Sequence, residues 1–156
     1  MFASGTLRRG FSLIELVIVV VIIGIIGAIA IPRMSRGATG AADSALAGNL
    51  AVLRNAIDLY ETEHPGQYPA VATIAAQLTT FSDDSGGVSA TKTSTHIFGP
   101  YLRTVPPLPV GTKKNATGIA SADGANVGWI YTVATGDIRA NTASEADARG
   151  KLYSAY

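Results

Sequence analysis

Apolar residues form one long run near the start of the chain. From Phe11 to Ile31 only Ser12 and Glu15 are polar. A helix rises about 1.5 Å per residue, so this run reaches roughly 32 Å, enough to cross the hydrocarbon core of a bilayer. The pattern therefore predicts a transmembrane helix over residues 11–31.

Beyond Pro32 the pattern changes to a single apolar stripe on an otherwise polar helix. Apolar residues recur there at spacings of three and four, with charged residues between them. Pro65 and Gly66 then interrupt the pattern, because neither extends a helix comfortably. We predict that the helix continues as an amphipathic extension over residues 32–64. The stripe that we expect to be buried beneath a covering layer comprises Leu46, Leu50, Leu53 and Ile57.

Residues 65–156 carry weaker patterns, which are typical of a small α+β domain. A short helix is expected over 71–81, an exposed polar loop over 82–96 and an extended, proline-rich connector over 105–111. Two strand-like segments flank a glycine-containing turn at 134–136, which predicts a β-hairpin. We expect a small antiparallel sheet around this hairpin to cover the helix stripe. Its candidate contacts are Trp129, Ile130, Tyr131 and Ile138.

The charge balance and the absence of cysteine exclude several classes of function. Twelve Lys and Arg residues nearly balance eleven Asp and Glu residues, and no basic cluster follows Arg36, so nucleic-acid binding is not predicted. The chain has no cysteine, which excludes disulfides, thiolate metal sites and a cysteine nucleophile. Arg8 and Arg9 precede the apolar run and favour a cytoplasmic N-terminal side, so the domain is expected on the opposite side.

The order of features from Arg8 to Tyr60 resembles the N-terminus of class III signal-peptide proteins, the type IV pilins and type II secretion pseudopilins. The string RRGFSLIELVIVVVIIGIIGAIAIPRM carries the resemblance: a basic leader, Gly10, Phe11, Glu15 and the apolar helix. The end of the chain most resembles a pseudopilin of the G type. The resemblance implies an α+β, pilin-like fold, with a long N-terminal helix whose first half spans the membrane.

For individual residues, the resemblance implies a leader over residues 1–10 that prepilin peptidase removes by cleaving between Gly10 and Phe11. The same enzyme would methylate the new amino group of Phe11. An isolated carboxylate within an apolar segment is costly, so we interpret Glu15 as a residue that sets the register of assembly. Near the interface Glu15 could equally remain hydrated.

A helix defect is expected between Gly24 and Pro32. Proline removes the backbone donor that would bond to Ala28, and glycine weakens the same stretch. The resemblance implies that this segment loses helical order in a filament. Gly24 and Ala28 would also suit close packing of helices in a membrane, and the two interpretations are compatible.

The predicted function is that of a structural subunit of a type II secretion pseudopilus, located in the inner membrane as a single-pass protein with a periplasmic domain. The alternative is a type IV pilin that serves adhesion, motility or DNA uptake. Implied partners are further copies, other pseudopilins, the prepilin peptidase and methyltransferase, a platform protein, an assembly ATPase and an outer-membrane secretin.

A second alternative is an ordinary secretory signal peptide cut after Ala30, because residues 28–30 form a small-x-small site. It would leave a soluble secreted domain. The apolar run is longer than the core of such signals, usually about 7–15 residues, and it contains Glu15. The helical stripe also continues beyond Pro32, so we prefer the pilin-like interpretation.

Little else in the sequence points to chemistry. No phosphate loop, nucleophile elbow or metal-binding histidine pair is present, so no enzyme, catalytic residue or metal site is predicted. His64 and His96 are interpreted as capping or solvated residues. Calcium is an alternative only, because the loop of residues 116–126 and the nearby acidic residues lack a recognisable ligand pattern. The acidic residues considered are Asp123, Asp137, Glu145 and Asp147.

Overall fold

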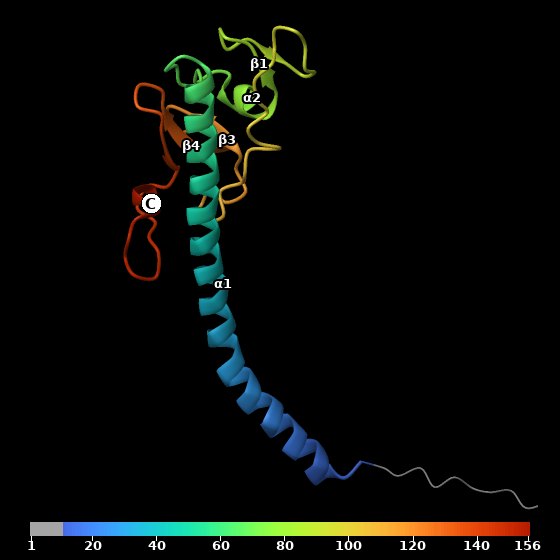
Figure 1. Cartoon of the computed structure of the whole chain (residues 1–156). Helices are drawn as coiled ribbons and strands as arrows, with labels where there is room; N and C mark the ends of the chain where they lie inside the picture. Colours follow the sequence, from blue (N-terminus) through green and yellow to red (C-terminus); the bar gives the residue numbers. More distant parts are fainter. Residues whose placement is uncertain (1–10) are drawn as a thin grey trace, which may run out of the picture. The chain divides into compact units, whose positions relative to one another are not determined.

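The computed structural model describes residues 11–156, except that the side chains of residues 30–38 are outside the described set. The expected leader, residues 1–10 with Gly10, lies outside the described residues. The chain divides into two compact units, with the boundary in the sequence between Ala38 and Thr39. Figure 1 shows the helices and strands coloured along the sequence. We describe each unit by itself.

The first helix, α1, comprises Leu13–Glu63 and contributes to both units. Its first turn begins where the carbonyl of Ser12 accepts a hydrogen bond from the amide of Leu16 at 3.2 Å. At its end Gly66 adopts a φ of +69°, and its amide donates to the carbonyl of Glu61 at 3.3 Å. This left-handed glycine closes the last turn, as the sequence Pro65-Gly66 predicted.

Two small elements follow in the C-terminal unit. The helix α2 spans Ile74–Thr79, within the expected range but shorter, because residues 71–73 form a turn. Strands β1 (Phe81–Ser82) and β2 (Val88–Ser89) then pair antiparallel, where we expected the last residue of the helix at Phe81 and a loop from Ser82 onward. The Oδ1 atom of Asp83 explains this short hairpin, since it accepts hydrogen bonds from the amides of Ser85 at 3.0 Å and Gly87 at 2.8 Å.

The main sheet contains β3 (Gly118–Ala120), β4 (Val127–Thr132) and β5 (Asp137–Ala140), in that order. The predicted hairpin is confirmed: β4 and β5 pair antiparallel and are joined through Gly136, which has a φ of +72°. The sheet is not purely antiparallel, however, because β3 pairs parallel to β4. A 3-10 helix, η1, follows at Tyr153–Ala155.

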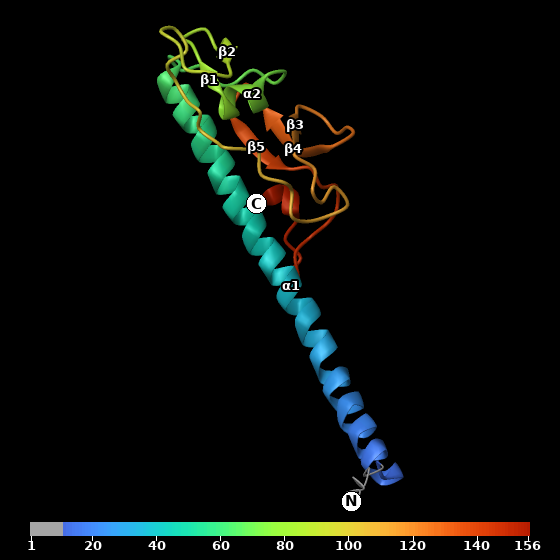
Figure 2. The same ribbon diagram turned by 90° about the vertical axis from the view of Figure 1, so that its right-hand side faces the viewer.

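The core of the C-terminal unit lies between this sheet and the second half of α1, which run alongside each other in Figure 2. Trp129 and Tyr131 alternate with Ile130 along β4, so the two aromatic rings share one face of the strand. Both rings, with Ile138, belong to the same cluster as the helix stripe. Ile130 is buried but lies outside that cluster. The stripe residues, with exposed fractions of 0–1%, are Leu46, Leu50, Leu53 and Ile57.

Candidate functional site

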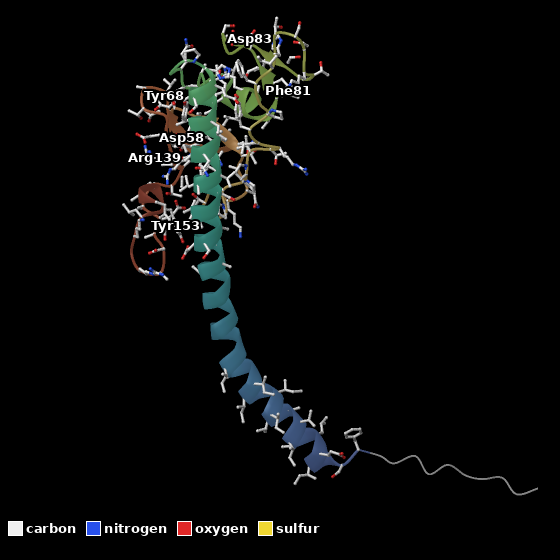
Figure 3. The ribbon with its side chains drawn as sticks, viewed as in Figure 1. Asp58, Tyr68, Phe81, Asp83, Arg139 and Tyr153 are labelled. Atoms are coloured by element: carbon white, nitrogen blue, oxygen red, sulfur yellow. The ribbon has the colours of Figure 1, made fainter. Side chains whose placement is uncertain are left out.

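The large apolar side chains that the structure describes in the N-terminal unit are exposed. Every large apolar residue from Leu13 to Ile29 is between 44% and 80% exposed, and Phe11 is 80% exposed. Figure 3 shows side chains projecting from both sides of the N-terminal part of α1. Exposure of so large an apolar surface to water is unfavourable, and the described residues of the chain do not bury it. Such a surface indicates contact with a membrane or with another protein.

Within the part of the chain that the structure describes, no helix is long and apolar enough to cross a membrane.

Glu15 lies in the first turn of α1, and its side chain is exposed. The amino end of a helix carries a partial positive charge, so a carboxylate here stabilises the helix locally. Phe11 precedes Glu15 by four residues and lies before the start of the helix. The predicted methylation residue, Phe11, and the predicted assembly residue, Glu15, are therefore close in sequence at the same end of α1.

The structure of the single chain shows no break in α1 at the position of the expected helix defect. Gly24 and Pro32 both fall within the bounds of α1, and a side chain added at Gly24 would meet nothing within 4 Å. The side chain of Pro32 lies outside the described residues. Loss of helical order between these residues in a filament remains a prediction.

The end of the chain is fastened to the second half of α1 by polar contacts. The Nη2 atom of Arg54 donates to the carbonyl oxygens of Tyr156 at 2.6 Å and Ile138 at 3.3 Å. The hydroxyl of Tyr156 donates to Asp147 at 2.6 Å; this bond raises the pKa of Tyr156 to about 12 and lowers the pKa of Asp147. These bonds hold η1 and its flanking loop against the helix.

Three buried polar side chains, His64, Gln77 and Ser82, hold α2 and β1 against the end of α1. The ring of His64 stacks on Tyr60 with centroids 3.8 Å apart, and its Nδ1 atom lies 2.9 Å from the Tyr60 carbonyl. Its Nε2 atom lies 3.1 Å from the Oγ atom of Ser82. Gln77 accepts from the amide of Ala70 at 2.9 Å and donates to the carbonyl of Gly86 at 2.8 Å.

This buried cluster decides between the two roles that we expected for His64. His64 caps the helix, as interpreted from its position, but it is only 1% exposed and is not solvated. Gln77 and Ser82 were not singled out from the sequence. The four-residue spacing of Tyr60 and His64, which stacks two rings on one helix face, was the signal that could have indicated burial.

The acidic residues considered for calcium have separate partners. Asp123 pairs with the Nζ atom of Lys113 at 2.8 Å and accepts from Asn141 at 2.8 Å, contacts that lower its pKa to about 2. Glu145 accepts from the amide of Thr112 at 2.6 Å, and Asp137 accepts from Thr135 at 2.7 Å. No group of three or more candidate metal ligands occurs among the described residues.

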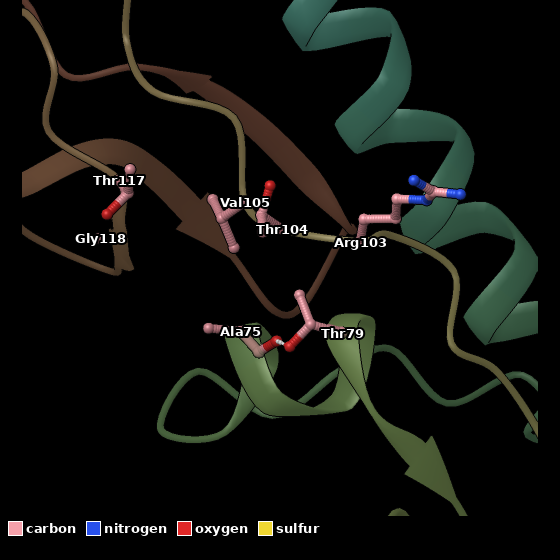
Figure 4. Close-up of a pocket in the computed structure, with 7 residues that line it drawn as sticks. All are labelled: Ala75, Thr79, Arg103, Thr104, Val105, Thr117 and Gly118. Atoms are coloured by element: carbon pink, nitrogen blue, oxygen red, sulfur yellow. Dashed lines mark hydrogen bonds between the residues drawn. The ribbon is translucent and has the colours of Figure 1, made fainter. Parts of the chain in front are cut away.

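A hollow of about 430 Å³ lies between α2, the segment 103–105 and the start of β3. Figure 4 shows Thr79, Arg103 and Thr117 on different sides of it, with Arg103 directed away from the two threonines. The Thr79 hydroxyl already donates to the carbonyl of Ala75 at 2.7 Å. The side chains around this hollow do not converge on one point, so the strongest functional signal remains at the N-terminus.

The comparison with known families agrees with that signal. Residues 6–31 match the family described as "Prokaryotic N-terminal methylation motif". The motif is a class III signal peptide; it implies a type IV pilin-like protein that prepilin peptidase processes and that polymerises, and it suggests an anchor in the inner membrane. Such proteins are generally structural rather than enzymatic. No curated protein and no solved structure matches the chain.

Proposed function

We propose that this chain is a structural subunit of a type II secretion pseudopilus. The observation that carries the proposal is the methylation motif over residues 6–31, which includes the part of α1 whose apolar side chains are exposed from Leu13 to Ile29. Protein export would then be driven by polymerisation of the subunit, while the energy comes from an assembly ATPase.

We infer that the exposed apolar surface contacts two environments in succession. Before assembly, lipid would surround the segment of residues 11–31, with the domain in the periplasm. After assembly, the corresponding helices of other copies would replace the lipid in the filament core. Both environments satisfy apolar side chains, so a subunit can pass from one to the other without exposing this surface to water.

Glu15 is proposed to select the register of that packing. Cleavage after Gly10 gives Phe11 a free amino group, and methylation preserves its positive charge. In a filament core the amino group of one copy can pair with Glu15 of another. A mismatched register would leave a buried charge without a partner, which is strongly unfavourable in a medium of low dielectric constant.

Glu15 variants test this proposal when they are the only copy in the cell. Glu15→Leu should insert into the membrane and be cleaved after Gly10, yet fail to enter filaments, whereas Glu15→Asp should retain partial assembly. The measurement is filament yield after shearing, compared with the cleaved fraction in membranes. Normal filament yield from Glu15→Leu would contradict the proposed role.

The choice of a secretion system rests on two features. The chain lacks the cysteines with which many adhesive pilins close a C-terminal loop, and it contains the β4–β5 hairpin, the segment that we compared in sequence with a G-type pseudopilin. The partners would be other pseudopilins, the prepilin peptidase, a platform protein, the ATPase and a secretin. A type IV pilin is the second candidate, because the same motif serves that class.

Deleting the gene from its host distinguishes the two systems. Loss of protein secretion, with twitching motility and surface piliation retained, is the result expected of a pseudopilin. Loss of motility or piliation with normal secretion would transfer the assignment to a type IV pilus. An adjacent gene for a retraction ATPase would favour the same transfer.

A further inference from the structure

The loop that precedes η1 closes one end of the C-terminal unit. We call residues 145–152 the C-terminal loop; its two ends pair through the antiparallel bridge of Ala146 and Leu152. Figures 1 and 2 both show this loop beside α1. The lining of a hollow of about 270 Å³ includes Gly40 from α1 and Arg149 from the loop. The C-terminal unit begins one residue before Gly40, so the loop lies against the first turn of α1 that belongs to this unit.

The acidic side chains of the C-terminal loop bond to backbone amides of the same unit. The Oδ1 atom of Asp147 accepts hydrogen bonds from the amides of Arg149 at 2.8 Å and Lys151 at 2.9 Å. Glu145 accepts from the amide of Thr112 at 2.6 Å. Both acidic residues are only partly exposed. Their carboxylates therefore fix the conformation of the loop.

The basic side chains of the loop are free in comparison. Arg149 and Lys151 are exposed, and neither forms an ion pair or donates a side-chain hydrogen bond among the described residues. The Nζ atom of Lys151 lies 4.1 Å from the centroid of the Tyr156 ring, a cation–π contact. The next residue, Leu152, is 43% exposed. The loop thus presents two cations and one apolar side chain to its surroundings.

The chain connection keeps this end of the C-terminal unit close to the predicted transmembrane segment. Gly40 follows Ile31, the last residue of that segment, by nine positions, which is about 14 Å along a helix. The polar headgroup layer extends roughly 5–7 Å beyond the hydrocarbon core on each side. Long basic side chains cover much of the remaining distance, because their flexible stems extend toward a polar interface.

We propose that Arg149 and Lys151 bind the phosphate groups of anionic phospholipids while the subunit is anchored in the membrane before assembly. The inference rests on the proposed membrane anchor. A guanidinium binds phosphate through two parallel hydrogen bonds, and an ammonium binds it as a point charge. Each basic residue at an anionic surface strengthens binding about fivefold. Leu152 adds an apolar contact at the interface.

The position of the loop favours lipid over a soluble anion as the partner. The cations belong to the end of the unit that is joined to the membrane segment, so phospholipid headgroups are present there at high local concentration. Attraction to an anionic surface decays within about 10 Å at ordinary ionic strength, which restricts the effect to groups at this end. The contact orients the C-terminal unit before assembly and ends when the subunit leaves the bilayer.

A single fluorescent probe tests this contact in the full chain, because the chain contains no cysteine. Ala148→Cys, at an exposed position of the loop, carries the probe, and one chain is placed in each lipid nanodisc. A small, fixed fraction of lipid with a nitroxide on its headgroup quenches probes near the surface. Quenching should be about twofold greater in an equal mixture of phosphatidylglycerol and phosphatidylcholine than in phosphatidylcholine alone.

Two double variants separate the specific contact from general charge. Arg149→Gln with Lys151→Gln should reduce quenching in the anionic mixture to the value in phosphatidylcholine. Lys92→Gln with Arg103→Gln removes two exposed cations outside the C-terminal loop, neither of them in an ion pair with a described residue, and it should leave quenching unchanged. Raised salt should remove the difference between the two lipid compositions.

Equal quenching in the two lipid compositions would overturn the proposal, as would equal effects of the two double variants. One chain per nanodisc excludes pairing with carboxylates of a second copy, and unchanged fluorescence of Trp129 shows that each variant is folded. A probe on Ile18→Cys, quenched by a nitroxide within the acyl chains, reports insertion of the first part of α1. If that probe is not quenched, the proposed anchor fails instead, so the two failures are distinguishable.

Discussion

The two described parts of α1 differ in how their apolar side chains are covered. From Leu13 to Ile29 every large apolar side chain is at least 44% exposed, whereas Leu46, Leu50, Leu53 and Ile57 in the second part are at most 1% exposed. Both parts are helical, so helix formation does not explain the difference. The second part is covered by other residues of the same chain, whereas for the first part we propose a cover of lipid or of other copies.

This comparison assigns different roles to the two parts of α1: the second part stabilises the folded C-terminal unit, and we propose that the first part serves assembly. We call the stripe of Leu46, Leu50, Leu53 and Ile57 the inner stripe. Changes on it should unfold the C-terminal unit without affecting the anchor. Changes at Glu15 should leave the unit folded and affect only the filament. The predictions below test that division, in decreasing order of expected effect.

Leu50→Asp should produce the largest loss of stability. Leu50 is 1% exposed, so the variant removes a packed side chain and places a charge in the core; we expect the free energy of unfolding to fall by about 4 kcal/mol. Trp129 is fully buried in the same cluster, and its fluorescence reports unfolding of the full chain in detergent micelles.

Val52→Asp is the matched control for this experiment. Val52 lies two residues away on the same helix but is 49% exposed, so a carboxylate there remains hydrated and stability should change by less than about 0.5 kcal/mol. Equal unfolding temperatures for the two variants would show that the inner stripe does not support the domain.

Ser82→Ala should have an intermediate effect. The variant leaves the Nε2 atom of His64 without its partner in a site where both side chains are at most 1% exposed. The expected loss is about 1–3 kcal/mol of unfolding free energy. Amide hydrogen exchange should increase most around β1 and the end of α1, since Ser82 also bonds Phe98 through its backbone. Uniform exchange across the domain would contradict a local role.

The smallest effect concerns pH. Lys113, followed by Asn141, lowers the pKa of the Asp123 carboxyl to about 2, below its ordinary value of 3.8. Because the folded-state pKa is depressed, the contribution of this contact is present above pH 4 and is lost as the pH falls toward 2. Asp123 is exposed, so we expect only a slight change in stability in that window.

Lys113→Met should raise the pKa of Asp123 toward its ordinary value, as measured by carboxyl NMR titration. Lys114→Met removes a neighbouring exposed lysine that forms no ion pair with a described residue, and it should leave this titration unchanged. Identical shifts in the two variants would assign the effect to general charge rather than to the contact.

Strong periodicity made the helix and the hairpin predictable. Leucine and isoleucine at helical spacing marked the inner stripe, and alternation around Gly136 marked β4 and β5. These signals extend over many residues, so tertiary contacts do not need to override local preferences.

The shorter elements could not be predicted from the sequence, because their patterns extend over too few residues. β1 and β2 have two residues each and β3 has three, too few for a recognisable alternation. The parallel pairing of β3 depends on contacts that join distant segments. The burial of His64 likewise depends on Ser82 and Phe98, which lie far along the chain from it.

The intact mass of the chain from membranes of cells that contain prepilin peptidase tests the central claim most directly. Our account requires that the first half of α1 be retained as the anchor and assembly helix, so the mature chain should begin at Phe11 and carry one added methyl group. A chain that begins at Ile31 would have lost that helix to an ordinary signal peptidase and would contradict the account.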